Sequence, residues 1–260
     1  MSKALFFDID GTLVSFRTHL IPQSAVDAIA KAKALGHKIV IATGRPKCII
    51  NNLGQIEHLI DGYVTTNGAF CFAGDNIVRQ LAFQERDTSI ILQDARRKHY
   101  PTIVVNHDRL RVINHNELVE RIFIKQLNIK NLDFTTPVDY ILRQPVMQIT
   151  SFIGHIREQR LAYRLNHTTV GRWHNAFVDF TPKGANKGNG ILAMADFFGI
   201  RREDTVAFGD GGNDIPMLRT AGIGVAMGNA GELTRQAADY ITKDIDEDGI
   251  ANALISLNLC

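Results

Sequence analysis

The sequence has few cysteines, little net charge and no long apolar run, and each shortage argues against a class of protein. Its three cysteines, Cys48, Cys71 and Cys260, are odd in number and far apart, which disfavours a disulfide framework or a zinc site. A net charge of +2 over 260 residues is too small to argue for binding to nucleic acid or to a membrane surface. No apolar stretch reaches the about 18 residues of a membrane span, and no leader pattern precedes the first strand. We therefore expect a cytoplasmic protein with reduced cysteines.

Most of the chain alternates strand patterns with helix patterns. Apolar strands are expected over residues 4–7, 39–42, 63–66, 205–208, 223–226 and 240–242. Helices are expected between them, one with Ser24 as its N-cap and another from Pro46 to about Leu53. Apolar strands that alternate with helices are typical of a parallel sheet covered on both faces. The pattern predicts an α/β fold with a doubly wound, mainly parallel sheet.

The middle of the chain has a different pattern. A helix near 87–98 precedes two strands, 102–105 and 109–113, with Asp108 in a tight turn between them. Further helices are expected at 117–127 and 156–165, and further strands at 146–152, 168–173 and 177–181. Paired strands indicate an antiparallel or mixed sheet, and hence a separate α+β unit. We place this insertion at residues 83–182, which leaves residues 1–82 and 183–260 for the α/β domain.

Polar side chains gather where the strands of the α/β domain end. Asp8 and Asp10 follow the first strand directly, and a buried strand end is costly for carboxylates unless a cation compensates their charge. Three other clusters stand at strand ends or helix starts: Thr43, Lys187, and the group Asp210, Asn213 and Asp214. Ligands of parallel sheets bind at the carboxyl ends of the strands, so these clusters are expected to form one site.

The groups in these clusters suit phosphoryl transfer. Its transition state is highly charged, so a protein must mainly position groups and neutralise charge. Asp8 and Asp210 are predicted ligands of Mg²⁺, which prefers oxygen donors, whereas zinc would need histidine or cysteine. A carboxylate can also attack phosphorus, and Asp10 could then protonate the leaving alcohol and later deprotonate water. Thr43, the backbone N–H groups after it and Lys187 would hold the phosphoryl oxygens.

Taken together, the clusters resemble the four signature motifs of the haloacid dehalogenase-like (HAD) superfamily, in the same order. The matching segments are Asp8–Thr12, Ala42–Arg45, Lys187 and Gly209–Asp214. The insertion between the second and third motifs resembles the larger cap of Cof-type sugar phosphatases, and Thr66–Ala69 resembles the same subgroup. Lys183 is a second candidate for the motif lysine, but a Lys-Gly pair before a helix favours Lys187.

The resemblance implies a role for each matching residue. Asp8 is expected to be the nucleophile, and Asp10 the acid/base, with its backbone carbonyl on the metal. The metal site would thus be Asp8, Asp10 and Asp210, supported by Asp214. The phosphate-binding residues would be Thr43, Gly44, Lys187 and Asn213. An aspartate at position 10 also separates the chain from the dehalogenases of the superfamily, which lack it.

Three further residues allow two interpretations each. Arg45 and Asn67 can be substrate contacts, or else helix-start and turn residues. Trp173 can line the substrate site or belong to the core of the insertion. Asp244, Asp246, Glu247 and Asp248 are expected to form a solvated acidic turn.

The sequence therefore predicts a Mg²⁺-dependent phosphatase that acts on a small phosphorylated metabolite, a sugar phosphate, through an aspartyl-phosphate. A phosphomutase or other phosphotransferase would use the same chemistry and stays open. A signalling receiver domain also has a phosphorylated aspartate, but it lacks a large insertion and an acid/base such as Asp10. We expect no nucleic-acid or membrane partner, and a monomer or small homo-oligomer.

Overall fold

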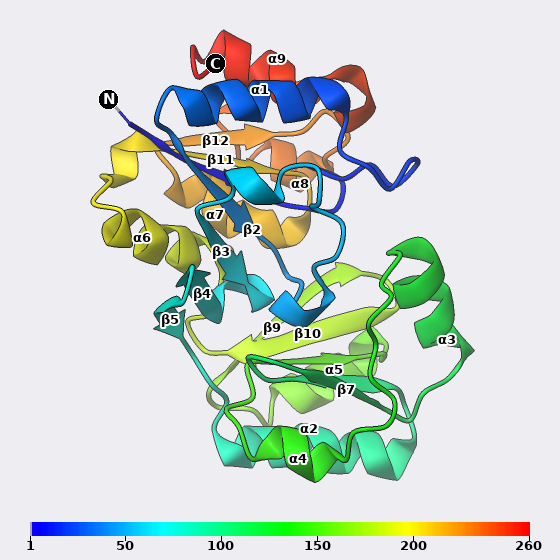
Figure 1. Ribbon diagram of the computed structural model, residues 1–260. Coiled ribbons are helices and arrows are strands. Elements are labelled where there is room, and N and C mark those ends of the chain that lie inside the picture. The colour runs from blue at the N-terminus through cyan, green and yellow to red at the C-terminus, as the bar shows by residue number, and fades with distance from the viewer. Residues whose placement is uncertain (1) are drawn as a thin grey trace. The chain divides into compact units, whose positions relative to one another are not determined.

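The computed structural model, which describes residues 2–260, divides into two compact units (Figure 1). The first, called the core unit here, comprises the chain up to Gly44 together with Asn51–Arg79 and Asn186–Cys260. The second, called the cap unit, comprises Gln80–Ala185 and the short segment Arg45–Ile50. Residues 45–50 are distant in sequence from the rest of the cap unit, yet their contacts group them with it.

The core unit is built on one eight-stranded sheet in the order β13-β12-β11-β1-β2-β3-β4-β5. Its strands are β1 (Ala4–Phe7), β2 (Lys38–Ala42), β3 (Gly62–Thr65), β4 (Phe70–Ala73), β5 (Asn76–Gln80), β11 (Thr205–Gly209), β12 (Ile223–Ala226) and β13 (Tyr240–Ile241). The strands from β13 to β3 pair in parallel, and β4 returns antiparallel to β3. The predicted mainly parallel α/β sheet is confirmed, although β4 and β5 were not expected.

Helices cover both faces of the core sheet. They are α1 (Gln23–Ala34), α6 (Lys187–Phe197), α7 (Ile215–Thr220), α8 (Glu232–Arg235) and α9 (Gly249–Ser256). Figure 1 shows α1 and α9 together on one face, with α6 and α7 on the other. On the α6 and α7 side, Phe6 and Val40 pack in one buried cluster with Met194 and Met217. Cover on both faces explains why β1 is apolar and buried at every position.

Two helix predictions for the first 53 residues are wrong. Ser24 does not cap a helix: α1 begins at Gln23 without a side-chain cap, and the Ser24 hydroxyl donates to Asp248 Oδ1 at 2.5 Å. The helix expected from Pro46 to Leu53 is only a 3₁₀ turn, η1 (Lys47–Ile49). Ile49 is buried in an apolar cluster of the cap unit, so tertiary packing overrides the local helical pattern there.

The cap unit has a five-stranded antiparallel sheet in the order β7-β6-β8-β10-β9. Its strands are β6 (Thr102–Val105), β7 (Leu110–Ile113), β8 (Gln148–Ser151), β9 (Thr168–His174) and β10 (Phe177–Pro182). Its α-helices are α2 (Glu85–Lys98), α3 (Glu117–Val119), α4 (Val138–Leu142) and α5 (His155–Ala162). The predicted α+β insertion is confirmed, and α4 was not expected.

Different elements cover the two faces of the cap sheet. On one face, Val104 and Phe180 pack with buried residues of α2, α4 and α5. On the other face, Ile103 and Phe177 pack with Ile122 and Phe123. The helix expected over 117–127 continues from α3 as a π-helix, η4 (Glu120–Gln126).

None of the helices within residues 2–260 has both the length and the apolar composition of a membrane span.

Candidate active site

Three neighbouring strands of the core sheet end at the predicted catalytic residues. Asp8 follows β1, Thr43 follows β2 and Asp210 follows β11, and these strands lie side by side in the order β11-β1-β2. The backbone extends the ladder past the strand ends, because Asp8 N–H donates to Phe208 O at 3.0 Å and Thr43 N–H donates to Val64 O at 2.8 Å. The parallel sheet thus brings together residues that are about 200 positions apart in the sequence.

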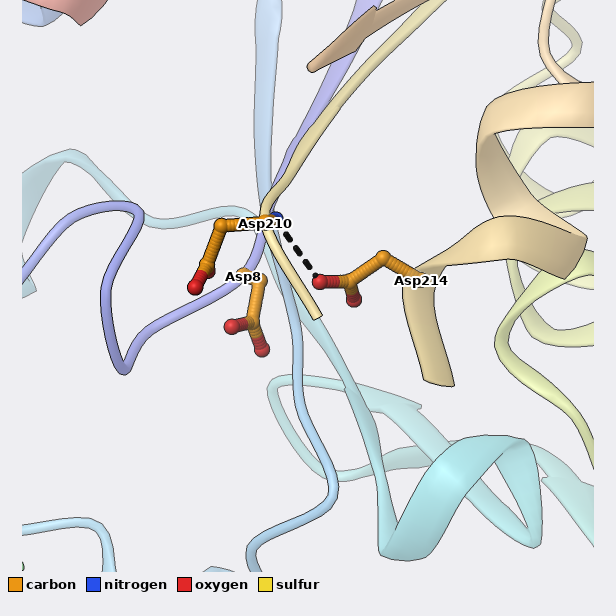
Figure 2. Close-up of side chains that lie close together, drawn as sticks. All are labelled: Asp8, Asp210 and Asp214. Atoms are coloured by element: carbon orange, nitrogen blue, oxygen red, sulfur yellow. Dashed lines mark hydrogen bonds between the residues drawn. The ribbon is translucent and has the colours of Figure 1, made fainter. Parts of the chain in front are cut away.

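The carboxylates of Asp8, Asp210 and Asp214 form a compact trio (Figure 2). One oxygen of each carboxylate lies within 4.8 Å of those of the other two. Asp8 and Asp214 are buried, and Asp210 is partly exposed. Buried oxygen donors at this spacing suit a hard divalent cation such as Mg²⁺ and do not suit zinc, which favours nitrogen and sulfur ligands.

Both carboxylate oxygens of Asp214 accept hydrogen bonds from other groups of the protein. Its Oδ2 accepts hydrogen bonds from the N–H groups of Asp210 at 3.0 Å and Gly211 at 2.8 Å. Its Oδ1 accepts from Lys187 Nζ at 2.5 Å. Because both oxygens have partners, Asp214 orients the 209–214 loop, whereas Asp8 and Asp210 are left to hold a cation. Asp210 is oriented in turn by the Thr12 hydroxyl, which donates to its Oδ1 at 2.7 Å.

Lys187 is the cation of the cluster. It is the first residue of α6, after the N-cap Asn186, and its side chain is fully buried. Its Nζ donates to Asp8 Oδ1 at 2.6 Å as well as to Asp214. Lys183, the other candidate for the motif lysine, is exposed and belongs to the cap unit. The ammonium at the carboxylates is therefore that of Lys187.

Burial and mutual repulsion disfavour the ionised forms of Asp8 and Asp210. Burial is the main cause that raises the pKa of Asp8, and the Asp214 charge adds to it. The same two causes raise the pKa of Asp210 to about 7. Burial alone would lower the pKa of Lys187, but Asp214 and Asp8 outweigh it and raise that pKa. Three carboxylates face one ammonium, so a divalent cation fits the charge of the cluster.

Asp10 lies on the loop after β1, outside the trio. It is partly exposed, and its backbone forms a bridge with Val14. Two hydrogen bonds fix the backbone of the next residue, Gly11. Its N–H donates to Val14 O at 3.0 Å, and its carbonyl accepts from Asn229 Nδ2 at 2.8 Å. Asn229 was not predicted, although it follows the end of β12 and the strand-end rule would have pointed to it.

Three of the predicted phosphate-binding residues, Thr43, Gly44 and Asn213, lie around Asn67. Thr43 is buried, and its carbonyl accepts from the Asn67 N–H at 3.1 Å. A Cβ atom at Gly44 would lie 3.1 Å from Asn67 Oδ1, so a larger residue there would push the Asn67 side chain aside by a few tenths of an ångström. Asn213 Nδ2 donates to that same Oδ1 at 3.1 Å. Asn67, one of the ambiguous residues, therefore lies at the site.

The other two ambiguous residues fall in the cap unit. Arg45 is buried, and its guanidinium donates to Ile49 O at 3.3 Å and Leu127 O at 2.9 Å. These bonds tie η1 to the end of the 117–127 segment, which is a structural role within the cap unit. Trp173 belongs to β9, but its side chain lies outside the described part of the structure.

Comparison with known proteins places this geometry in a family. A family model described as haloacid dehalogenase-like hydrolase matches residues 5–254, nearly the whole chain. The chain belongs to the haloacid dehalogenase-like hydrolase family. The resemblance carried by the four motifs is thereby confirmed.

Individual members of the haloacid dehalogenase-like family match over nearly their full length. The solved structure of "the HAD Subclass IIB Sugar Phosphatase BT4131" superposes with a TM-score of 0.94 at 44% identity, covering 100% of both chains. The Bacillus subtilis (strain 168) protein named "Putative phosphatase YkrA" is 31% identical over 261 residues, which are 99% of this chain and 98% of that protein. YitU of the same organism, named 5-amino-6-(5-phospho-D-ribitylamino)uracil phosphatase, is 28% identical over 95% of this chain and 94% of its own. The predicted class of enzyme, a phosphatase, is confirmed.

Proposed function

We propose that this enzyme is a Mg²⁺-dependent phosphatase that hydrolyses a small sugar phosphate through an aspartyl-phosphate on Asp8. The observation that carries the proposal is the contact of Asp8 with Lys187 inside the carboxylate trio. A buried nucleophile, a neutralising ammonium and carboxylates spaced for a divalent cation are the parts that phosphoryl transfer needs.

The cation would be held by the carboxylates of Asp8 and Asp210 and by the backbone carbonyl of Asp10. When bound, Mg²⁺ neutralises charge on the phosphoryl oxygens and on the carboxylates around them. The raised pKa values of Asp8 and Asp210 support this assignment, because burial without a compensating charge disfavours their ionised forms.

Asp8 attacks phosphorus in the first step. Lys187 holds Asp8 Oδ1, so the attacking atom is the other oxygen, Oδ2. The Asp8 O–P bond forms as the bond from phosphorus to the sugar oxygen breaks, and Asp10 donates its proton to that oxygen. Asp10, now a carboxylate, takes a proton from water as the water attacks phosphorus. The Asp8 O–P bond then breaks, and inorganic phosphate is released.

Donors around the phosphoryl group stabilise its charge in both steps. We assign this role to the Thr43 hydroxyl, the Gly44 N–H, the Lys187 ammonium and the Asn213 amide. Fixed donors in a partly buried site need little reorganisation as charge develops, which makes them effective in the transition state. The position of Thr43 and Gly44 just past β2 supports the assignment, since strand ends of parallel sheets bind ligands.

The sugar-phosphate class is supported by the names of two relatives. One is called a sugar phosphatase and the other acts, by its name, on a phosphoribityl compound. We further propose that the insertion at 83–182 acts as a cap that selects the leaving group. Substrate contact by Arg45 and Trp173 stays a prediction within this proposal.

Phosphate release in isotopically labelled water tests the proposal. The enzyme with Mg²⁺ would be incubated with phosphorylated hexoses, pentoses and nucleotides, and released phosphate would be analysed by mass spectrometry. We expect release from at least one sugar phosphate, with one solvent ¹⁸O per phosphate. Transfer of unlabelled phosphoryl groups to a second sugar would instead establish a phosphotransferase. No release from any compound would overturn the proposal.

A further inference from the structure

The turn η3 (Thr66–Gly68) holds three consecutive residues in the left-handed region. Their φ angles are 49° at Thr66, 53° at Asn67 and 83° at Gly68, and all three residues are buried. A β-branched residue such as Thr66 rarely adopts a positive φ. Thr66 Oγ1 is also buried without a hydrogen-bond partner among the described residues. The turn is therefore strained, and the surrounding structure must impose it.

Two contacts on the core unit impose this conformation. The Asn67 N–H donates to Thr43 O at 3.1 Å, which joins the turn to the end of β2. Gly68 lies against the backbone of Asn186, so close that a Cβ atom there would collide with the Asn186 carbonyl. Asn186 is the N-cap of α6 and directly precedes Lys187. The turn thus joins the segments that carry Thr43 and Lys187.

The strained backbone places the Asn67 amide against Asn213. Asn67 Oδ1 accepts from Asn213 Nδ2 at 3.1 Å. A Cβ atom at Gly44 would lie 3.5 Å from Asn213 Nδ2, whereas one at Gly211 would lie 2.7 Å from Asn213 Oδ1. The nitrogen end of the Asn213 amide therefore lies toward Asn67 and Gly44, and the oxygen end lies toward Gly211.

An asparagine amide has nearly the same shape after a half-turn, so only its partners decide which end faces which group. We infer that Asn67 is a positioning residue that acts through Asn213. By accepting one proton of the Asn213 amide, it keeps the N–H end, and not the oxygen, on the side of Gly44. An N–H attracts a phosphoryl oxygen, whereas an amide oxygen repels it. This inference rests on the proposed function, and it gives Asn67 an indirect role in place of substrate contact.

Asn67→Gly is the decisive variant, because it removes the side-chain acceptor and leaves a residue that tolerates positive φ. We expect the KM for p-nitrophenyl phosphate and the inhibition constant of inorganic phosphate to rise roughly tenfold, because the variant loses one hydrogen bond to a charged ligand. The melting temperature should change little, since asparagine and glycine both tolerate a positive φ. A merely structural role would lower the melting temperature and leave KM unchanged.

Asn258→Gly is the matched control. Asn258 has a φ of 54°, is exposed and follows α9, far from the carboxylate trio in the chain. The same chemical change at the same backbone conformation should leave KM and the inhibition constant unchanged. An equal rise in KM for both variants would overturn the inference.

A double-mutant cycle shows whether Asn67 acts through Asn213. Asn213→Ala alone should raise KM, and adding Asn67→Gly to it should change KM by less than about twofold, because coupled residues are not additive. The inference would be overturned if the two substitutions raised KM by independent factors that multiply. It would also be overturned if KM were unchanged in Asn67→Gly while the wild type is active.

Calorimetric binding of inorganic phosphate with Mg²⁺ separates this inference from the proposed function. If the wild type binds phosphate but hydrolyses no compound, the proposed function is overturned and the inference is not. The double-mutant cycle is then measured as changes in phosphate affinity.

Discussion

Lys187 donates a 2.6 Å hydrogen bond from Nζ to Asp8 Oδ1, although the two residues are 179 positions apart in the sequence. The same ammonium also donates to Asp214 and is fully buried. Burial alone would lower the pKa of Lys187, but the two carboxylates outweigh it and raise that pKa. The lysine therefore stays charged and compensates part of the negative charge around Asp8, the proposed nucleophile.

Lys187→Met should damage both stability and catalysis. It leaves two buried carboxylates without their cation, and breaking a buried ion pair by removing one partner costs about 3–5 kcal/mol. Loss of a charged donor to the phosphoryl group should slow turnover at least about a hundredfold. Denaturant unfolding and phosphate release measure the two effects. Lys183→Met, at an exposed lysine four residues earlier, is the control and should change neither; a Lys187→Met enzyme with wild-type turnover would contradict the role of Lys187.

Gly11→Ala should displace the carboxylate of Asp210, the proposed metal ligand. Gly11 has a φ of 87°, and a Cβ atom there would collide with the Asp210 carboxylate. Gly36 has the same φ with no atom within 4 Å of such a Cβ, so Gly36→Ala reports the backbone strain alone. We expect both variants to lose about 1–2 kcal/mol of stability from a left-handed alanine. Only Gly11→Ala should also weaken Mg²⁺ activation, and equal Mg²⁺ titrations for both variants would argue against a cation at Asp210.

Mg²⁺ should stabilise the folded enzyme in the absence of substrate. A ligand that binds only the folded state at about 100 times its Kd adds about 2.7 kcal/mol, so the melting temperature should rise with Mg²⁺ and fall again with a chelator. Asp210→Asn should abolish this rise, and without Mg²⁺ it should be at least as stable as wild type, because it removes a charge that the neighbouring Asp214 carboxylate repels. Asp196→Asn, at an exposed aspartate on α6, should keep the full rise. Differential scanning calorimetry of the three proteins, each with and without Mg²⁺, measures these differences.

Asp94 should make the stability of the cap unit depend on acid pH. Its buried carboxylate accepts from Arg157 at 2.7 Å, Tyr100 at 3.0 Å and Arg97 at 3.1 Å. Burial alone would raise the pKa of Asp94, but these bonds, led by that of Arg157, outweigh it and lower the pKa. A carboxylate whose pKa is lower in the folded state than in the unfolded state stabilises the fold at pH values above its unfolded pKa, about 3.9. This stabilisation is lost as the pH falls through the pKa of the folded state.

The variant that tests this is Asp94→Asn. At pH 7 its free energy of unfolding should lie about 1–3 kcal/mol below that of wild type, the loss of hydrogen bonds to a charged group. The difference should shrink as the pH falls below about 4. Urea unfolding at several pH values measures it, with Asp139→Asn at an exposed position as control. A constant difference over the whole pH range would refute the prediction.

The sequence was sufficient for the parallel part of the core sheet and for the meeting of the proposed catalytic residues, because both follow from local patterns. A carboxylate directly after an apolar strand can be read without coordinates, and the fixed geometry of a parallel sheet then predicts that Asp8 and Asp210 meet. Asn229 obeys the same rule after β12 and could have been found in this way.

Features imposed by distant contacts could not be predicted. Thr66 disfavours a positive φ, and only the contacts of the following residues with Thr43 and Asn186 explain the turn. The helix expected after Pro46 fails for the same reason, because Ile49 is recruited to an apolar cluster of the cap unit. In both places tertiary contacts outweigh local propensity.

The central claim is that Asp8 is the nucleophile, and the rate of phosphate release by Asp8→Asn tests it most directly. The measurement compares wild type and variant with Mg²⁺ and the sugar phosphate that wild type turns over fastest, after circular dichroism has shown that the variant is folded. We predict a loss of at least about a thousandfold, as for removal of a covalent nucleophile. Turnover by Asp8→Asn within a few-fold of wild type would contradict the account.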